Sequence, residues 1–600
     1  MKAAKKSPET NFVIYPSDDE SRLLFTNGAL IESEFIIRSY VIVNSDLNFV
    51  AFKNGVRCEE RDFMSFMQFS RLILRFSDFL NLLAFLNSDV TLAPIKHVVS
   101  LLEDYLQTMS ETDGNLRKLS FLTEQLSLLQ KKPQNRRYSK NTILSAIIIQ
   151  SHSTVCYEAL LKNELLTLPS VSSIRRICHG FQAETSQQMK TYLASRKKNL
   201  NEFESTVVLI FDEMYVFETI DYSSNTFYGL ATNKNAPATT ILTFMVKSLA
   251  GKYCDVIGMF PLHGFNVGIL TDIFRKVMQL VLDVGFDCVC CVCDNHPINR
   301  SLFKNLGGGN LQHCVPNPCD PQKDLFLLID PTHNVKNIYN NFQRRTHIKF
   351  PETDAFPQLM GNFNHIKELF YTERHMALRM AHKLNEKVLN PSVTNRTSAK
   401  LAAAIFHEST YSALEYFSDS DEDKKKWGDT AAFLKTIHDL WAIINVKTKS
   451  IGYRRRDEKR LPISSISDER LNLLQNFEDL FKASARQSGK EKLSSETLQA
   501  LILMCQTLRH IVPHLLQAGF QYVLLGHLQS DPLEHRFGEY RQRSGSNYFL
   551  AVKQVLESER KMKVSYLPKL GLWCRNYTIL LTSSVQFCVL TLMSCLFSNS

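Results

Sequence analysis

One stretch constrains the fold of this chain more than any other. Residues 207–211 read Val-Val-Leu-Ile-Phe, and Asp212 follows them directly. A short apolar run rich in β-branched residues is typical of a strand that is buried on both faces of a sheet. Asp212 then lies at the carboxyl end of that strand, where open α/β sheets display reactive side chains. The alternative is that Asp212 only begins the turn after a core strand.

Two later strands are expected to end in the same way. Residues 287–293 lead into Asp294, and residues 325–329 lead into Asp330. The pattern also predicts a hairpin of residues 217–220 and 226–230, a strand at 239–246, and helices at 268–284 and 296–306. Along the chain, several strands are followed by a helix, a strand, a second helix and a further strand. This order is close to that of a ribonuclease-H-like sheet.

Composition sets the broad class. Six hundred residues exceed what one core can use, so several domains are expected. The apolar share of 44% and the charged share of 22% are ordinary for a soluble globular protein. A net charge of +10 favours a polyanionic partner, although the excess is dilute over this length. Fourteen cysteines without a secretory leader indicate a reducing compartment.

The first 132 residues carry no clear functional motif. Residues 1–60 contain strand-like runs at 35–37 and 40–43, and the first cysteine is Cys58, so no zinc finger can be built before it. Residues 61–132 are helical in pattern. Leu119, Leu122, Leu126 and Leu129 have the 3-4-3 spacing of a coiled-coil seam, which would form a dimer. The alternative is an ordinary amphipathic helix.

Residues 133–200 are predicted to form a helix-turn-helix-like region that binds DNA. Ser139 can cap a helix at 140–151, Ser153 can cap a second helix that ends near residue 163, and a third begins after Leu168-Pro169-Ser170. The basic residues expected to contact DNA are Arg136, Arg137, Arg175 and Arg176. The alternative is a small helical packing module with solvated arginines.

Three carboxylates carry the predicted chemistry. Asp212 and Asp294 end neighbouring strands, and Asp531-Pro532 begins a helix on which Glu534 lies one turn in. Phosphodiester cleavage is well served by two divalent ions about 3.5–4 Å apart. Carboxylate oxygens suit Mg²⁺ or Mn²⁺. The alternatives are that Asp531 caps its helix and that Glu534 is a solvated helix charge or its capping partner.

Several motifs together resemble the P-element-type transposases, the group that includes THAP-containing transposases. The matching stretches are residues 137–139, 168–170, 209–214, 330–338, 384–391 and 529–534, within a span of about 115–560. The most specific is Gln529-Ser530-Asp531-Pro532-Leu533-Glu534. The match at Asp294 is looser, because residues 296–298 read His-Pro-Ile, although Asn299 fits the family pattern.

The resemblance implies a fold and an activity. It implies an α/β protein whose ribonuclease-H-like catalytic domain, at 201–345 and 521–565, is interrupted by a helical insertion domain at 346–520. Asp212, Asp294 and Glu534 would be the catalytic and metal-binding triad, with Asp531 as a helper. Mg²⁺ or Mn²⁺ would be the metal, DNA the partner, a homo-oligomer the assembly and the nucleus the location.

The insertion explains why residues 294 and 534 are 240 positions apart. In the family this domain binds GTP, and Lys383, Lys387, Lys400 and Asn445 are the candidate contacts here. One departure is that the family's aromatic-Asp-x-x-Asn pattern carries Ala442 in place of the Asp. The missing carboxylate would otherwise be able to bind the guanine base of GTP or a metal ion. The basic cluster at 454–456 and 459–460 is interpreted as a solvated loop, with nucleic acid contact as the alternative.

Two classes of function remain open at this stage. The first is a DNA transposase that cuts and joins strands. The second is a DNA-binding or scaffold protein derived from a transposase, without catalysis. Residues 577–597 contain no charged side chain, which is long enough for a membrane span, but they are rich in Ser, Thr and Cys. We therefore expect residues 566–600 to be an atypical apolar tail from a truncated or misread gene end, with no membrane partner.

Overall fold

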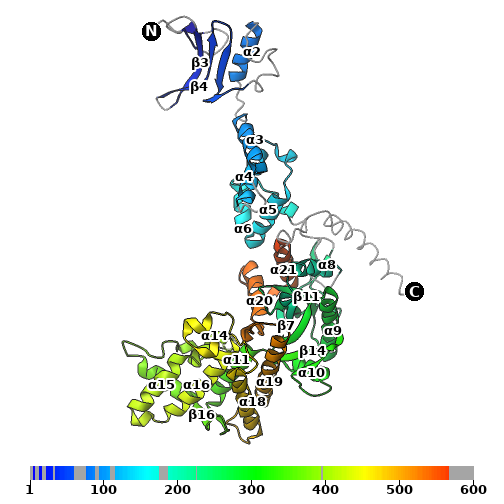
Figure 1. The fold of residues 1–600 in the computed structure, drawn as a ribbon, viewed down its shortest axis with the longest axis vertical. Helices are drawn as coiled ribbons and strands as arrows, with labels where there is room; N and C mark the ends of the chain where they lie inside the picture. The colour runs from blue at the N-terminus through cyan, green and yellow to red at the C-terminus, as the bar shows by residue number, and fades with distance from the viewer. Residues whose placement is uncertain are drawn as a thin grey trace, which may run out of the picture. The chain divides into compact units, whose positions relative to one another are not determined.

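The computed structural model of the chain contains two compact units, residues 1–139 and 140–600 (Figure 1). It describes residues 5–6, 13–16, 22–31, 34–53, 55–59, 76–87, 93–108, 115–174, 187–223, 226–392, 396 and 398–566. The predicted DNA contacts Arg175 and Arg176, and the apolar tail after residue 566, lie outside these ranges.

The first unit begins with a six-stranded antiparallel sheet in sequential order. Its strands are β1 Lys5–Lys6, β2 Val13–Pro16, β3 Arg22–Ile31, β4 Glu34–Asn44, β5 Phe49–Lys53 and β6 Val56–Arg57. Helix α2 (Phe76–Asn87) packs on this sheet, because Leu82 and Leu86 share a buried core with Phe25 and Val41. The strand-like runs predicted at 35–37 and 40–43 both lie within β4.

Two helices complete the described part of the first unit. They are α3 (Ala93–Thr108) and α4 (Leu116–Leu129), which contact each other. The predicted leucine stripe lies on α4, and Leu122 and Leu129 are 54% and 56% exposed. An apolar stripe left on the surface of one chain is compatible with a coiled-coil seam, and dimerisation through it stays a prediction.

The helices predicted at the start of the second unit are present. They are α5 (Lys140–His152) and α6 (Thr154–Lys162), and the Ser153 hydroxyl accepts a hydrogen bond from Cys156 N at 3.1 Å, as expected of a cap. Residues 171–174 are helical, so a third helical segment begins where the sequence predicted it. Arg137 is exposed and Arg136 is half-buried.

A seven-stranded mixed sheet forms the centre of the second unit. Its order is β11-β10-β7-β12-β14-β13, with β17 paired to the far end of β7. The bounds are β7 Thr206–Phe217, β10 Thr240–Ser248, β11 Cys254–Leu262, β12 Asp287–Cys293, β13 Cys314–Asn317, β14 Asp320–Ile329 and β17 Leu550–Ala551. β7 runs antiparallel to β10 and parallel to β12, so the predicted ribonuclease-H-like sheet is confirmed.

The sequence placed the end of β7 too early. The strand does not stop before Asp212 but continues to Phe217, because β10 pairs with it along this length and β17 pairs with its last two residues. The predicted hairpin arms therefore move, and the hairpin consists of β8 (Asp221–Ser223) and β9 (Thr226–Tyr228). Strand β11 was not predicted at all.

Helices cover the sheet on both faces. On one side α8 (Gln187–Lys197), α9 (Val267–Val284) and α10 (Pro297–Leu306) pack together, and the ring of Phe211 on β7 lies 6.3 Å from that of Phe274 on α9. On the other side lie α11 (Pro331–Arg345), α20 (Asp531–Arg543) and α21 (Val552–Tyr566), which share one buried core with Val208 and Ile210 of β7. Helix α21 also contacts α5.

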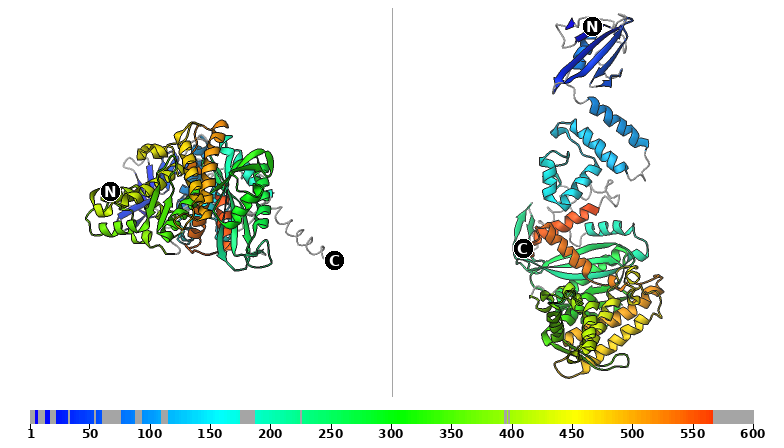
Figure 2. Two further views of the ribbon diagram at one scale, coloured as in Figure 1. Left: turned by 90° about the horizontal axis from the view of Figure 1, so that it is seen from below. Right: turned by 90° about the vertical axis from the view of Figure 1, so that its left-hand side faces the viewer.

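The predicted helical insertion between β14 and α20 is present. It contains a small hairpin of β15 (His347–Phe350) and β16 (Leu359–Asn362). Its helices are α12 Phe363–Glu373, α13 Glu386–Leu389, α14 Ala399–Ile405, α15 Glu408–Ser420, α16 Trp427–Ile444, α17 Ile451–Arg455, α18 Glu469–Arg486 and α19 Ser495–Gln517. Figures 1 and 2 show these helices gathered at one end of the central sheet.

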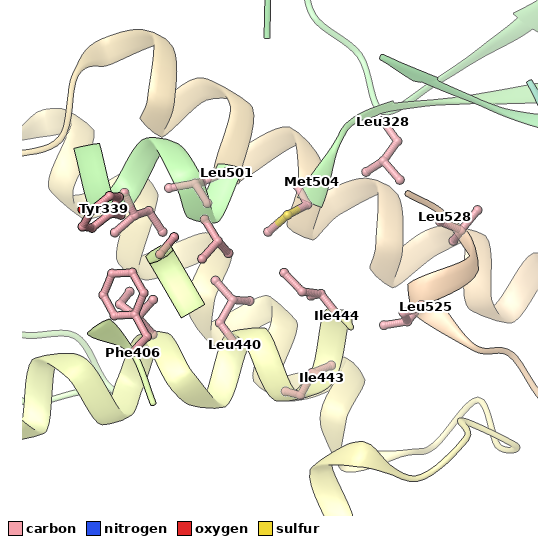
Figure 3. Packing of buried hydrophobic residues seen from close by; sticks show 14 of the residues in the cluster. Leu328, Tyr339, Phe406, Leu440, Ile443, Ile444, Leu501, Met504, Leu525 and Leu528 are labelled. Atoms are coloured by element: carbon pink, nitrogen blue, oxygen red, sulfur yellow. The ribbon is translucent and has the colours of Figure 1, made fainter. Parts of the chain in front are cut away.

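One continuous apolar core joins the insertion to the sheet. Figure 3 shows Ile443 and Ile444 at the end of α16 close to Leu525 and Leu528, which precede α20, and Met504 of α19 near Leu328 of β14. Thr507 Oγ1 of α19 also donates a hydrogen bond of 2.6 Å to Leu327 O. The insertion is therefore packed against the element that leads to Glu534. None of the helices within the described ranges has the length and apolar character needed to cross a bilayer.

Candidate active site

Asp212 lies on the face of β7 that packs against α20. Side chains alternate along a strand, so Asp212 shares its face with Met214 and Val216. Both of these lie in one buried core with Leu533 and Phe537 of α20, the helix that carries Glu534. The neighbouring carboxylate, Glu213, points to the opposite face by the same alternation. Because of this alternation, Asp212 lies on the same face of β7 as the Glu534 helix, and Glu213 does not.

Parallel pairing of Ile210 with Val292 brings Asp212 and Asp294 to neighbouring positions on β7 and just after β12, and the Glu534 helix α20 contacts β7. Burial, followed by the charge of Asp294, raises the pKa of Asp212 to about 7, and Glu534 adds a smaller increase. His333 acts in the opposite direction. Burial and the charges of Asp212 and Asp294 raise the pKa of Glu213 to about 8. Such a concentration of negative charge favours either a proton or a metal cation.

Asp294 is held in place by the helix that follows it. Its Oδ1 accepts hydrogen bonds from His296 N at 3.0 Å and from Asn299 Nδ2 at 2.7 Å. Asn299 is almost fully buried on α10, where Pro297 occupies the first turn. The residues that depart from the family pattern therefore begin a helix whose Asn299 still orients the carboxylate.

Glu534 is held by two cationic side chains of α11. Its Oε1 lies 2.7 Å from His333 Nε2 and 3.3 Å from Lys336 Nζ. The hydrogen bond from His333 is the main reason that the pKa of Glu534 falls to about 2, although burial opposes it, and the charge of Lys336 adds to the effect. Burial lowers the pKa of His333, but the bond to Glu534 and the charge of Asp330 outweigh it and raise that pKa. Sequence reasoning quoted both residues within a motif but gave neither a role.

Asp330 connects the two parts of the ribonuclease-H-like domain. It is fully buried at the start of α11, where its carboxylate accepts hydrogen bonds from Thr332 N at 3.2 Å and His333 N at 3.3 Å. Ser530, the residue before α20, donates to it through Oγ at 2.8 Å and through N at 3.4 Å. A buried carboxylate with four donors fixes the beginnings of both helices.

Asp531, the predicted helper, is the first residue of α20, and Ser530 is the N-cap position. The Asp531 carboxylate accepts a hydrogen bond from Thr332 Oγ1 at 3.3 Å and forms an ion pair with Lys447. Lys447 follows α16, so this pair is a polar contact between the insertion and the Glu534 helix.

The chemistry of the site suits a divalent cation. Hard carboxylate oxygens are the preferred ligands of Mg²⁺ and Mn²⁺, and two of the three predicted ligands repel each other strongly enough to raise a pKa. Within the described ranges, no three His, Cys, Asp or Glu side chains lie close enough to share one ion as they stand. Glu534 is instead bound to His333 and Lys336. The oxygen atoms of Asp212, Asp294 and Glu534 are of the chemical type that Mg²⁺ and Mn²⁺ prefer, so the three residues fit such an ion by their chemistry.

A second site lies in the insertion domain. It is a pocket of about 810 Å³ that is lined by basic, acidic and aromatic side chains. The side chains that matter here are Tyr411, Lys435, His438, Asp439, Asn445, Lys447, Arg454, Arg455, Arg456, Asp457, Lys459 and Arg460. Ion pairs of 3.0 Å between Lys459 and Asp439 and of 2.8 Å between Arg460 and Asp457 brace its wall. The predicted basic cluster lines this pocket, and its Arg454, Arg455 and Arg456 are exposed, as expected of solvated side chains. The cluster lies on α17 and a short 3-10 helix at Glu458–Arg460, where a loop was predicted.

The predicted nucleotide contacts do not all meet there. Asn445 lines the pocket, whereas Lys383, Lys387 and Lys400 are exposed and outside its lining. Ala442 is fully buried on α16 and contributes nothing to the lining, but Asp439, one turn earlier, does. The signal for the pocket was the spacing of polar residues along α16, which sequence reasoning did not use.

Comparisons with known proteins agree with this geometry. The family described as TNP-like, RNase H N-terminal domain, matches residues 180–307, and the TNP-like, GTP-binding insertion domain matches residues 332–455. The Transposable element P transposase of Drosophila melanogaster is 21% identical over 440 residues, which are 72% of this chain and 55% of that protein. The chain is thus similar in sequence to a P-element transposase.

The solved structure of the Drosophila P element transposase strand transfer complex shares the fold. It matches with a TM-score of 0.64 and 20% identity over 78% of this chain and 99% of the solved chain. The chain spans about half the length of the curated P-element transposase that it matches in sequence. The ribonuclease-H-like domain with a large insertion, predicted from the motifs, is thereby confirmed.

Proposed function

We propose that this chain cuts and joins DNA strands with Mg²⁺ or Mn²⁺ bound by Asp212, Asp294 and Glu534. One observation carries the proposal: β7 and β12 pair in parallel up to the residues just before Asp212 and Asp294, and α20, which carries Glu534, contacts β7. Bound metal would activate water and stabilise the leaving oxygen of a phosphodiester. The family relationship supports DNA as the substrate.

The protein's own residues prepare the site in three ways. Asn299 orients Asp294, and the alternation of β7 directs Asp212 towards α20. His333 and Lys336 keep Glu534 ionised, because they hold its pKa at about 2. Their positive charge also lies where the negative charge of a phosphate would arrive, which stabilises an approaching DNA strand. Arg136, Arg137, Arg175 and Arg176 remain proposed DNA contacts, and a nuclear homo-oligomer remains the proposed setting.

Cleavage of a labelled DNA duplex tests the proposal, and the duplex carries the terminal sequences of the transposable element that encodes the chain. Asp212→Asn is expected to reduce Mg²⁺-dependent product at least a hundredfold, whereas Glu213→Gln, on the other face of the same strand, retains cleavage. Equal product from wild type and Asp212→Asn contradicts the assignment. Equal loss in both variants means that the alternation argument does not identify the ligand.

We also propose that the pocket of the insertion domain binds GTP. Its volume of about 810 Å³ is in the usual range for a site of a drug-sized ligand. It combines cationic side chains that suit phosphates with Tyr411 and Asn445, which suit a base. Binding of labelled GTP, competed by unlabelled GTP but not by ATP, is the expected result. Failure of the purified chain to retain GTP removes this part of the proposal.

One observation favours the second function class, a DNA-binding or scaffold protein without catalysis. Glu534 is held by two cations of α11 and is not grouped with Asp212 and Asp294 as a three-ligand set. If metal does not draw Glu534 away from His333, the site binds DNA without cutting it. Retention of labelled duplex with no product in Mg²⁺ or Mn²⁺ is the result that selects this class.

A further inference from the structure

A buried group of charged and hydroxyl side chains lies against α20, the helix that carries Glu534. Its members come from α20, α21, β11 and α8, and we call it the buried charge cluster: Arg536, Tyr540, Glu559, Lys563, Asp255, Tyr192 and Arg196. All but Arg196 are at most 8% exposed. Ionised side chains are seldom buried to this extent, because the loss of their hydration is costly. None of these residues belongs to the candidate metal site.

Glu559 of α21 is the centre of the buried charge cluster. Its Oε2 accepts a hydrogen bond of 2.7 Å from Tyr540 Oη and lies 3.9 Å from Arg536 Nη1. Its Oε1 lies 3.6 Å from Lys563 Nζ. Arg536 Nη1 also lies 3.7 Å from Glu539, a partly exposed residue of the same helix. One fully buried carboxylate therefore joins α20 to α21 and lies between two buried cations.

Lys563 connects the cluster to the edge of the central sheet. Its Nζ donates a hydrogen bond to Val256 O on β11 and lies 3.3 Å from Met189 Sδ on α8. β11 is the last strand on its side of the described sheet. Tyr192 Oη of α8 donates a hydrogen bond of 2.8 Å to Asp255, the neighbour of Val256. The polar contacts therefore run from α20 through α21 to an edge strand, and they attach α20 to the sheet in addition to its apolar core.

The cluster holds α20 on a side that faces away from Glu534. Successive residues of an α-helix are about 100° apart around its axis, so Glu534 lies about 160° from Arg536 and about 120° from Tyr540. A side-chain end about 5–6 Å from the axis moves by about 1 Å when the helix rotates by about 10°. Such a rotation breaks the 2.7 Å contact between Glu534 and His333, because a donor and an acceptor about 3.7 Å apart form no hydrogen bond.

Apolar packing alone does not define this rotation as sharply. Leu533 and Phe537 of α20 lie in the shared core, where apolar contacts have no preferred direction. A buried ion pair adds little net stability over apolar residues of the same volume, but its hydrogen bonds require one geometry. The Tyr540 hydroxyl is fully buried, so α20 cannot turn without leaving that hydroxyl unpaired.

We propose that Glu559 is a positioning residue, which fixes the rotation of α20 through Tyr540 and Arg536 and thereby directs Glu534. In the metal-free chain the result is the contact between Glu534 and His333. With a divalent ion bound, the same hold keeps Glu534 on the side of α20 that faces the ion. The inference rests on the proposed function only for this second role.

A double-mutant cycle on the metal-free full chain, measured by urea unfolding, tests the first role. Glu534→Gln is expected to lower the folding equilibrium constant of wild type about fivefold, because it weakens the charged contact with His333. Tyr540→Phe removes one hydroxyl and releases α20. In that background Glu534→Gln is expected to lower the constant by less than about twofold.

Thr507→Val is the matched control for Tyr540→Phe. It also removes a fully buried hydroxyl, which donates a hydrogen bond of 2.6 Å to Leu327 O away from α20. Glu534→Gln should keep its fivefold effect in this control. Glu559→Gln is expected to abolish the effect as Tyr540→Phe does, whereas Glu478→Gln, which changes a buried carboxylate held by two cations in the insertion, should not. If Glu559→Gln does not fold, the Tyr540→Phe cycle alone decides.

The cycle separates positioning from a purely structural role. Additive effects of Glu534→Gln and Tyr540→Phe overturn the inference, because a merely structural hydroxyl leaves the contact of Glu534 unchanged. Loss of coupling in Thr507→Val as well also overturns it, since the loss then reflects general destabilisation. An absent effect of Glu534→Gln in wild type overturns it too, because Glu534 is then not held.

Neither metal nor DNA enters the cycle, so its result does not depend on cleavage. Loss of coupling in a chain that never cuts DNA supports this inference and contradicts the proposed function. In a chain that does cut DNA, Tyr540→Phe should lower kcat about tenfold to a hundredfold at unchanged KM for DNA, because a displacement of about 1 Å misplaces Glu534. Thr507→Val should leave both constants unchanged. An unchanged kcat in Tyr540→Phe overturns the role with metal bound.

Discussion

Ser530 Oγ donates a hydrogen bond of 2.8 Å to the buried carboxylate of Asp330, although the two residues are 200 positions apart in the chain. The bond joins the start of α11, before the insertion, to the start of α20, after it. Because α11 carries His333 and Lys336 while α20 carries Glu534, the same bond sets the geometry of the cations that hold this carboxylate. The insertion can therefore be long without changing how Glu534 is held in the candidate site.

Replacement of Ser530 tests this connection. Ser530→Ala removes a hydrogen bond to a buried carboxylate, and such bonds contribute about 1–3 kcal/mol to the free energy of unfolding. We expect the midpoint of urea unfolding of this domain to fall accordingly. Ser544→Ala, at the opposite end of the same helix, is expected to change stability by less than about 0.5 kcal/mol. Equal effects of the two variants contradict a special role for the Ser530–Asp330 bond.

Asp212 makes the stability of the metal-free protein depend on pH. Its pKa is about 7 in the folded chain and near 3.8 when unperturbed, so the folded state holds this proton more tightly. The resulting stability is complete below about pH 3.8 and is lost as the pH rises through about 7. Asp212→Asn is therefore expected to melt at a higher temperature than wild type at pH 8 without divalent metal.

Addition of Mn²⁺ should reverse that order, because a ligand of the folded state stabilises it and only the wild type keeps the carboxylate. Glu213→Gln is the matched control. Its pKa of about 8 has the same sign of shift, so it should also gain stability at high pH, yet it should retain the Mn²⁺-induced increase. A Mn²⁺ response in Asp212→Asn equal to that of wild type means that Asp212 is not a ligand.

The sequence predicted the parts of this site that depend on local pattern. Continuous apolar runs revealed β7, β12 and β14, and hence Asp212 and Asp294, since such runs require a sheet covered on both faces. β11 was missed because Asp255 and Gly258 interrupt its apolar pattern. The extension of β7 was missed because two carboxylates read as a turn, whereas pairing with β10 keeps them in a strand.

Contacts between distant segments could not be predicted in this way. The bonds from His333 and Lys336 to Glu534 join residues about 200 positions apart, and no periodicity records them. The pocket of the insertion has the same origin, since it forms where the end of α16 meets residues 451–460. Sequence reasoning selected lysines by charge alone, and three of the four candidate contacts lie outside the lining.

Acid stability tests the role of His333. The pKa of Glu534 is lowered from 4.5 to about 2, so the stability that this group contributes is present above pH 4.5 and lost as the pH falls towards 2. His333→Gln removes the main cause of that shift and should move the midpoint of acid unfolding to higher pH. Lys425→Met, which removes an exposed lysine of the insertion, is expected to leave the midpoint unchanged. An unchanged midpoint in His333→Gln contradicts the proposed hold on Glu534.

Nucleotide binding can distinguish the pocket from the lysines predicted by sequence. Arg455 lines the pocket, while Lys387 is exposed on α13 outside it. A charged hydrogen bond to a phosphate is worth about 1.5–3 kcal/mol, so Arg455→Gln is expected to weaken binding of a fluorescent GTP analogue about tenfold or more. Lys387→Gln should bind as wild type does. The reverse result, measured by fluorescence anisotropy, places the nucleotide at α13 and removes the pocket from the mechanism.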